Sequence, residues 1–235
     1  MQFFFSLELT DEVLAAQAFV FFLAGFETSS TTMSFCLYEI SNRRDIQDRM
    51  SEEAKQVLEK HGEFTYEALQ DLKYMQQVID GKFLFIVLTF FFFFLSETLR
   101  MYPPATILLR ICTKRYMLED RGAIIEPNTR VFIPTWSFHR DPELFPEPEI
   151  FDPERFSEEN KPKIVPYSYM PFGEGPRICI GLRFAMMEMK LALANLVTKY
   201  RVVRSSKFKP FAIDPRAFIL APLDGVWLKV EKRLN

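Results

Sequence analysis

Cys179 has the strongest chemical signature in this chain. It lies among glycines, two residues after Arg177, and directly before an apolar stretch that predicts a helix over 182–200. A thiol at a helix N-terminus meets the positive end of the macrodipole and free backbone N–H groups, which favour the thiolate. A thiolate is a soft metal ligand, glycines let a flat ligand approach the backbone, and a guanidinium pairs with an anionic group. The spacing therefore predicts a flat, anionic metal cofactor.

Other interpretations of this cysteine are weaker. The three cysteines, Cys36, Cys112 and Cys179, are far apart and form no C-x-x-C pair, which argues against a zinc site. An odd, sparse set also argues against a disulfide framework and for a reducing compartment. The glycines at 173 and 175 lack the third glycine, leading strand and acidic partner of a dinucleotide loop. A lone cysteine is most often a small buried residue, so its context carries the interpretation.

Two further groups of residues have spacings that suit chemistry. Glu97 and Arg100 are three residues apart, which puts a carboxylate and a guanidinium on one face of a helix. The run from Ala24 to Thr28 combines small residues with an acid and a hydroxyl inside a long apolar stretch. In a helix the Thr28 hydroxyl can bond the carbonyl one turn back and loosen the helix there. Each pattern alone is also typical of an ordinary ion pair or a buried helix.

The order of these motifs resembles the cytochrome P450 family. Residues 172–181 match every fixed position of its haem-binding signature, F-x-x-G-x-R-x-C-x-G. The resemblance implies haem b (iron protoporphyrin IX) with the Cys179 thiolate as axial ligand, which favours cleavage of the O–O bond. It also implies that the following positions contact the haem: Phe172, Gly173, Gly175, Arg177 and Gly181.

The same resemblance gives Glu97 and Arg100 a third partner. The family joins its E-x-x-R pair to an arginine of a P-E-R-F-like element, which matches Arg155 in this chain. The resemblance therefore implies a buried charge triad. Such a network sets geometry more than net stability, but the loss of one member leaves a desolvated charge.

The run from Ala24 to Thr28 is similar to the family's A-G-x-[DE]-T oxygen-binding element. By that resemblance Ala24 and Gly25 leave room for dioxygen above a haem, while Glu27 and Thr28 pass protons towards it. Arg110 is implied to reach a haem propionate, with an exposed arginine on a strand edge as the alternative. Substrate would lie against residues from three ranges: 19–25, 105–109 and 218–220.

The fold class that this pattern predicts is mainly α with small β-sheets, as in the C-terminal portion of the cytochrome P450 fold. Thr10 and Asp11 can cap a first long helix, which is apolar almost all round and therefore predicted to be buried in a large protein. Short β-runs are expected over 107–134 and 201–230, with turns at 126–128 and 224–225. The expected helices cover 14–38, 46–60, 67–71, 75–80, 97–101 and 182–200.

Length and composition agree with one large domain. The chain has 235 residues, 49% of them apolar, and a formal net charge of −2, which gives no indication of nucleic acid. The resemblance runs from about residue 9 to 230 and covers only the C-terminal half of a family member. We divide the chain into three parts. Residues 1–80 hold the oxygen-binding helix and the helices after it, and residues 81–96 are an anomalous apolar insert. Residues 97–235 hold the E-x-x-R helix, the meander and the haem-binding loop.

The apolar insert, Gly81–Ser96, separates Asp80 from Glu97, which the family would join directly. We interpret it as a translated intron. Gly81-Lys82-Phe83 can be encoded across a donor site, phenylalanines 90–94 match a polypyrimidine tract, and residues 95–97 suit an acceptor. Phenylalanines 3–5 resemble a second remnant. A buried core helix and a membrane-dipping insert are the alternatives, although the apolar run is shorter than the roughly 20 residues of a span. Because the run should split a helix and favour aggregation, this polypeptide is expected to bind haem poorly.

The resemblance implies a microsomal haem-thiolate monooxygenase, most like insect members that oxidise foreign compounds. Its implied partners are O2, a lipophilic substrate and an NADPH–cytochrome reductase, with cytochrome b5 as a further candidate and no nucleic acid. Arg183 and Lys190 are candidate contacts for the reductase. The parent would lie at the cytosolic face of the endoplasmic reticulum, anchored by an N-terminal helix absent from this chain. The alternatives are a non-catalytic truncated or mis-spliced product and a haem-thiolate isomerase or dehydratase, against which Thr28 argues.

Overall fold

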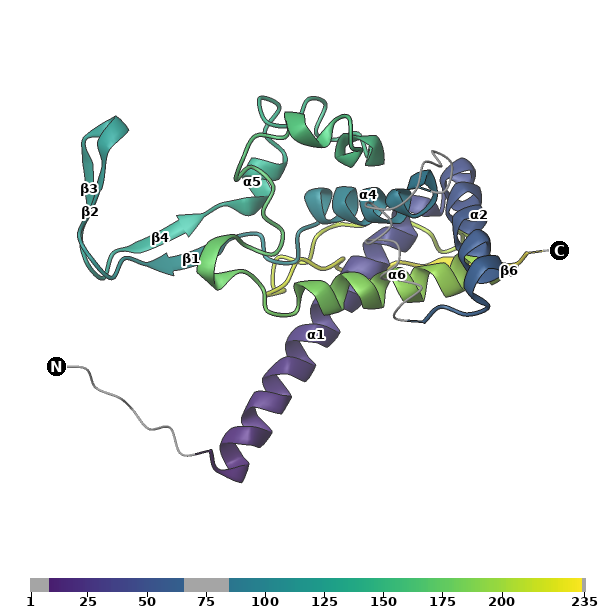
Figure 1. The fold of residues 1–235 in the computed structure, drawn as a ribbon, viewed down its shortest axis with the longest axis horizontal. Coiled ribbons are helices and arrows are strands. Elements are labelled where there is room, and N and C mark those ends of the chain that lie inside the picture. The colour runs from purple at the N-terminus through teal and green to yellow at the C-terminus, as the bar shows by residue number, and fades with distance from the viewer. Residues whose placement is uncertain (1–8, 66–84, 234–235) are drawn as a thin grey trace.

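A computed structural model of the chain describes residues 9–65 and 85–233. Its longest helix, α1 (Asp11–Ile40), begins after Thr10, whose side chain accepts a hydrogen bond from the Val13 N–H at 3.4 Å. Asp11 lies in the first turn, where a negative charge favours the helix dipole. The helix crosses beneath the others and projects beyond them at its N-terminal end (Figure 1). The predicted cap and helix are confirmed.

Within this chain, the predicted burial of the helix is seen only in its C-terminal half. Residues 14–24 are all exposed, and Phe22 and Phe26 are 71% and 62% exposed. Burial begins at Ser29 and continues to Ile40, because only this half packs against other elements. Among the described helices, α1 alone is long and apolar enough to cross a membrane, a test that a core helix also passes.

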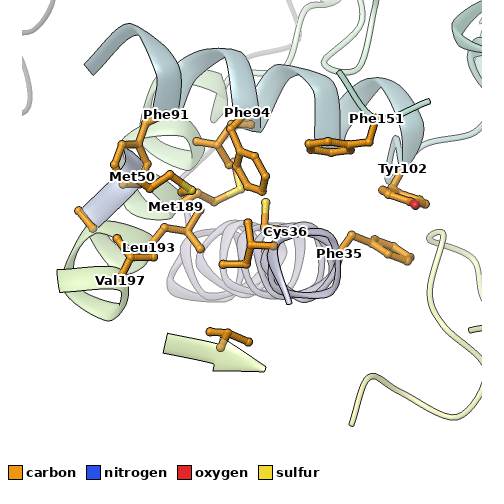
Figure 2. Packing of buried hydrophobic residues seen from close by; sticks show 14 of the residues in the cluster. Phe35, Cys36, Met50, Phe91, Phe94, Tyr102, Phe151, Met189, Leu193 and Val197 are labelled. Atoms are coloured by element: carbon orange, nitrogen blue, oxygen red, sulfur yellow. The ribbon is translucent and has the colours of Figure 1, made fainter. Parts of the chain in front are cut away.

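Three more helices pack around the buried half of α1. The second, α2 (Arg44–His61), ends at Gly62, whose φ of 78° is a left-handed cap conformation that glycine adopts without strain. The last, α6 (Leu182–Lys199), contacts both α2 and α1. Figure 2 shows their shared core, in which Cys36 on α1 points towards α4. Its members include Phe35, Cys36, Met50, Phe91, Phe94, Met189, Leu193 and Val197.

The fourth helix, α4 (Phe85–Met101), corrects the sequence prediction. A helix was expected only from residue 97, yet α4 is continuous across the boundary between Ser96 and Glu97. The range 85–101 contains no glycine or proline to break it, and Phe91 and Phe94 are at most 1% exposed. Residues 85–96 of the insert therefore extend the helix of Glu97 towards its N-terminus. The helix ends before Pro103 and Pro104, as expected.

Several predicted features lie outside the described residues. These are the helices at 67–71 and 75–80, the phenylalanines at 3–5, and residues 81–84 of the insert.

The β-structure consists, in the part of the chain described, of three antiparallel pairs. This confirms the predicted class, mainly α with small sheets. The predicted turns are present, since Asn128 and Gly225 have φ values of 67° and 70°. A short helix, α5 (Thr135–His139), follows the first pairs and leads into an irregular segment. The pairs are β1 (Leu108–Ile111) with β4 (Arg130–Ile133), β2 (Tyr116–Leu118) with β3 (Ala123–Ile125), and β5 (Tyr200–Arg204) with β6 (Leu228–Lys232).

Candidate functional site

The Cys179 thiol is exposed, and the backbone around it is fixed. The Cys179 N–H donates to the Phe172 carbonyl at 2.9 Å, which closes the loop. Gly181 then caps α6, and its carbonyl accepts the Ala185 N–H at 2.8 Å. A Cβ added to Gly181 would lie 3.8 Å from the Cys179 sulfur. The thiol is thus presented at the N-terminal end of a long helix, where the dipole favours a negative charge.

Two glycines give the loop its shape. Gly173 and Gly175 have φ values of 74° and 77°, a region that other residues rarely adopt. Residues 175–177 form a short 3-10 turn, and Arg177 at its end is exposed. This local geometry follows from the sequence, because glycine at both positions removes the strain of the turn.

Arg110 lies against this loop. It comes from β1, and its Nη2 atom is 3.7 Å from the place where a Cβ on Gly173 would stand. Its Nη1 atom donates to the Leu109 carbonyl at 2.9 Å. The Arg177 carbonyl is 3.8 Å from the same place on Gly173. Gly173 therefore lies next to the Arg110 side chain and the Arg177 backbone, and both arginines are predicted to bind anionic groups.

The oxygen-binding element predicted on α1 is helical throughout. The Thr28 hydroxyl donates to the Ala24 carbonyl at 2.7 Å, the hydrogen bond expected from the sequence. Glu27 is exposed, and an added Cβ on Gly25 would meet no atom within 4 Å. This side of α1 is therefore open where the resemblance requires space.

One hydrogen bond ties this region to the cysteine helix. The Ser29 hydroxyl donates to Glu188 on α6 at 3.2 Å, and Ser29 is 2% exposed. No hydrogen bond or ion pair between Thr28 and Cys179 occurs among the described residues. The oxygen-binding element thus lies on α1 and the cysteine loop leads into α6, and these two helices contact each other.

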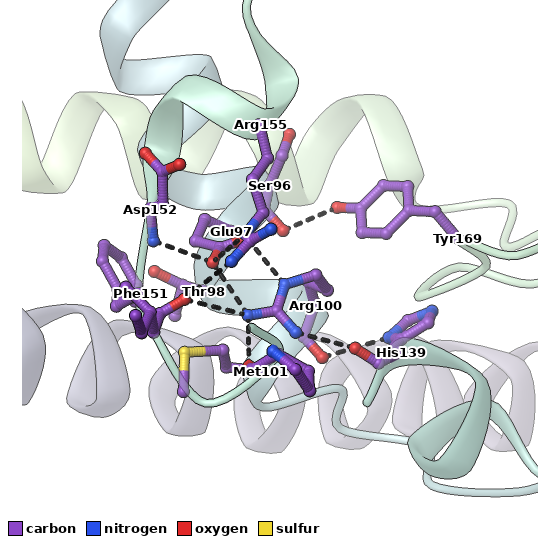
Figure 3. A network of polar contacts seen from close by, with 12 residues as sticks. Ser96, Glu97, Thr98, Arg100, Met101, His139, Phe151, Asp152, Arg155 and Tyr169 are labelled. Atoms are coloured by element: carbon purple, nitrogen blue, oxygen red, sulfur yellow. Dashed lines mark hydrogen bonds and ion pairs between the residues drawn. The ribbon is translucent and has the colours of Figure 1, made fainter. Parts of the chain in front are cut away.

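The predicted triad is assembled in the interior (Figure 3). Arg100 donates from Nε and Nη2 to the two Glu97 oxygens at 2.7 and 2.8 Å, and both side chains are 0% exposed. Arg155 Nε lies 3.5 Å from Glu97, an ion-pair distance without hydrogen-bond geometry. The Asp152 N–H also donates to Glu97 at 2.9 Å. Glu97 therefore joins α4 to the 3-10 turn η2 (Pro153–Phe156).

Burial affects the proton equilibria of this cluster. It raises the pKa of Glu97, while the hydrogen bonds and charge of Arg100 oppose that shift. It likewise raises the pKa of Tyr169, whose hydroxyl donates to the Ser96 carbonyl at 3.0 Å. Because Glu97 has three hydrogen-bond donors around it, the buried carboxylate is well satisfied.

His139 belongs to this cluster, and sequence reasoning missed it. Its carbonyl accepts from Arg100 Nη1 at 2.7 Å, and its ring is 0% exposed. Burial lowers the pKa of His139 to about 4, so the ring is neutral near pH 7. The available signal was weak: His139 is one of two histidines and follows Trp136 at a helical spacing.

The residues of the loop fit the predicted haem. The thiol is exposed, and two glycines adopt left-handed conformations. Arg110 and Arg177 lie next to Gly173, so the site suits an iron porphyrin with anionic side groups. The described residues contain no group of three His, Cys, Asp or Glu side chains placed to bind a metal ion. A single cysteine ligand is sufficient for a haem-thiolate protein, because the porphyrin supplies the other iron ligands.

Comparison with known proteins establishes the class of protein. The chain belongs to the cytochrome P450 family, whose model matches residues 6–81 and 88–228. It is 43% identical over 95% of its length to the probable cytochrome P450 6a13 of Drosophila melanogaster. Cytochrome P450 9e2 of Blattella germanica is 42% identical over 96% of the chain. The chain spans 42% and 40% of these relatives.

The family match bears on the insert. Residues 82–87, which the family model leaves unmatched, lie inside the predicted insert, but the match resumes before Glu97. The family match thus includes residues 88–96, which belong to α4 in the structure.

Proposed function

We propose that this cytochrome P450 is a haem-thiolate monooxygenase that inserts one oxygen atom of O2 into apolar substrates, xenobiotics or endogenous lipophiles. Electrons come from an NADPH–cytochrome reductase, with cytochrome b5 as a further candidate donor. The observation that carries the proposal is the exposed Cys179 thiol, held by the Phe172 carbonyl at the start of α6. Bound haem supplies the activation of O2, and the protein supplies binding, orientation and protons.

Three residues hold the cofactor in this proposal. Cys179 binds the iron as a thiolate, which the N-terminal end of α6 stabilises. Arg110 and Arg177 pair with the propionate groups, since each is a permanent cation on chain that borders Gly173. The left-handed conformation of that glycine keeps the backbone close to the ring.

Thr28 and Glu27 would deliver protons to the oxygen that reacts at the haem. Because the Thr28 hydroxyl bonds the Ala24 carbonyl, that carbonyl is drawn from the helix ladder and water can enter there. Glu27 is exposed and can exchange protons with solvent. An acid and a hydroxyl in adjacent positions can then pass a proton to the reacting oxygen.

The test compares Cys179→Ala with Cys112→Ala. Cys112 is the matched control because its side chain is part-buried outside the loop and its sulfur contacts the Lys114 carbonyl. We expect Cys179→Ala to abolish the thiolate-type spectrum of the reduced carbon monoxide complex, and Cys112→Ala to retain it. A full spectrum in Cys179→Ala would overturn the proposal. Turnover that requires NADPH and reductase would separate a monooxygenase from an isomerase or dehydratase.

One observation favours a second candidate, a non-catalytic product, for the chain as given. Large apolar side chains on α1 are exposed, including Phe19 at 63% and Phe22 at 71%. In this chain taken alone, exposed apolar surface of this kind promotes association. Titration of the purified chain with haem distinguishes the two, because a non-catalytic product gives no saturable binding.

The site of action in this proposal is the cytosolic face of the endoplasmic reticulum membrane, as in microsomal enzymes. The reductase would approach the face where Cys179 lies, with Arg183 and Lys190 as contacts. Fractionation of cells expressing the full-length transcript tests the localisation.

A further inference from the structure

Both ring nitrogens of His139 are hydrogen-bonded to backbone groups, and together they fix its tautomer. The Met170 N–H donates to Nε2 at 2.9 Å, so Nε2 carries no proton. Nδ1 therefore carries the proton and donates to the Arg100 carbonyl at 3.2 Å. The ring also stacks on Tyr169, with 5.3 Å between ring centroids. Figure 3 shows the ring beside Arg100 at one end of the ion cluster.

The bond to Met170 leads directly into the cysteine loop. The Met170 carbonyl accepts the Gly173 N–H at 3.1 Å. Two residues further along the chain from Met170, the Phe172 carbonyl accepts the Cys179 N–H at 2.9 Å. A continuous series of hydrogen bonds and short chain segments thus runs from Arg100 through His139 to the backbone of Cys179.

We propose that His139 is a positioning residue that fixes the cysteine loop to the buried ion cluster of α4. The two functions of its ring are separate: Nδ1 anchors the histidine to Arg100, and Nε2 holds the start of the loop at Met170. The part that concerns haem rests on the proposed function, whereas the part that concerns the loop backbone does not.

Substitution of His139 by asparagine or by glutamine distinguishes this role from simple packing. In His139→Asn the amide nitrogen takes the place of Nδ1, so the bond to Arg100 is kept and the acceptor for Met170 is lost. In His139→Gln the amide oxygen takes the place of Nε2, so the acceptor for Met170 is kept. A residue that acts only by filling space would respond similarly to both changes.

The experiment measures amide hydrogen exchange of Met170, Gly173 and Cys179 in the full chain without haem. We expect these amides to exchange about tenfold faster in His139→Asn than in His139→Gln, which is the effect of one lost hydrogen bond. Tyr169→Phe is the matched control, because it removes the hydroxyl bond to Ser96 and keeps the ring against His139. It should leave the exchange of these amides unchanged.

Equal exchange in His139→Asn and His139→Gln would overturn the proposal. A measurement on the wild-type chain needs no variant: the Met170 amide must be protected, and exchange at the rate of a free amide would also overturn it. In haem-loaded protein, His139→Asn should lose the thiolate-type carbonyl spectrum more readily than His139→Gln. Failure of the full-length protein without residues 81–96 to bind haem would count against the proposed function and leave the exchange result standing.

Discussion

Arg100 and His139 bind each other in both directions. Arg100 Nη1 donates to the His139 carbonyl at 2.7 Å, and His139 Nδ1 donates to the Arg100 carbonyl at 3.2 Å. The same guanidinium neutralises Glu97. One side chain therefore satisfies a buried charge and holds α5 against α4, which makes it a sensitive position for mutation.

Arg100→Ala should destabilise the chain by about 3–5 kcal/mol, because it leaves Glu97 buried without its main counter-charge. Denaturant unfolding measures this. Arg216→Ala is the control, since its ion pair is 79% exposed on the arginine side and should contribute little to stability. We also expect Arg100→Ala to prevent haem incorporation. A complete protein that keeps its haem spectrum after this change would contradict that expectation.

The stability of the chain should fall in acid through His139. The unfolded histidine titrates near 6.5 and the folded one near 4, so protons favour the unfolded state as the pH falls between these values. Burial causes the shift, and the nearby charges of Arg100 and Arg140 add to it. The expected loss is about 1.4 kcal/mol per pH unit. Urea unfolding from pH 7 to 4 measures it against His139→Gln, which should lack this component; parallel curves would contradict the assignment.

Glu53 should act in the opposite direction. It is 3% exposed, and burial raises its pKa to about 9, although the charge of Arg49 and the Phe91 backbone oppose the shift. The folded state therefore binds this proton more tightly, and stability is lost as the pH rises from about 4.5 towards 9. Glu53→Gln should remove a slope of about 1.4 kcal/mol per pH unit. The control is Glu52→Gln, a change to the neighbouring exposed acid; equal slopes in both variants would refute the prediction.

Thr28→Ala should reduce product formed per NADPH consumed in the active enzyme, on the order of 10²-fold if the hydroxyl is a proton carrier. Thr28→Ser keeps the hydroxyl that bonds the Ala24 carbonyl and should retain most of the coupling. Stability should change little, since Thr28 is only part-buried. Comparable coupling in the alanine and serine variants would exclude the hydroxyl from proton delivery.

Deletion of residues 81–96 should improve haem incorporation if this segment is a translated intron. Residue 80 then takes the place of residue 96, and the helix keeps its apolar positions with smaller side chains. Haem content per chain, with and without the segment, measures the effect. Spliced transcripts that retain these codons would contradict the intron hypothesis. The substituted core positions are Met75 for Phe91, Val78 for Phe94 and Ile79 for Leu95.

Much of the candidate site could be predicted from the sequence because its signals are local. The glycines around Cys179 specify the left-handed turns at 173 and 175, and the Thr10 cap and Gly62 specify helix ends. The spacing of Glu97 and Arg100 specifies a pair on one helix face. Each of these depends on residues within one or two turns, so no distant contact was needed.

Other features were decided only by the tertiary structure. Burial of α1 depends on what packs against it, so the apolar sequence alone did not separate the exposed residues 14–24 from the buried residues after Ser29. Residues 85–96 of the insert form part of α4 because the core accepts Phe91 and Phe94, which decides for the buried-helix alternative. His139 acquires its position from Arg100, 39 residues earlier, and Met170, 31 residues later. Local spacing determines which side chains can act, whereas long-range packing determines what holds them in place.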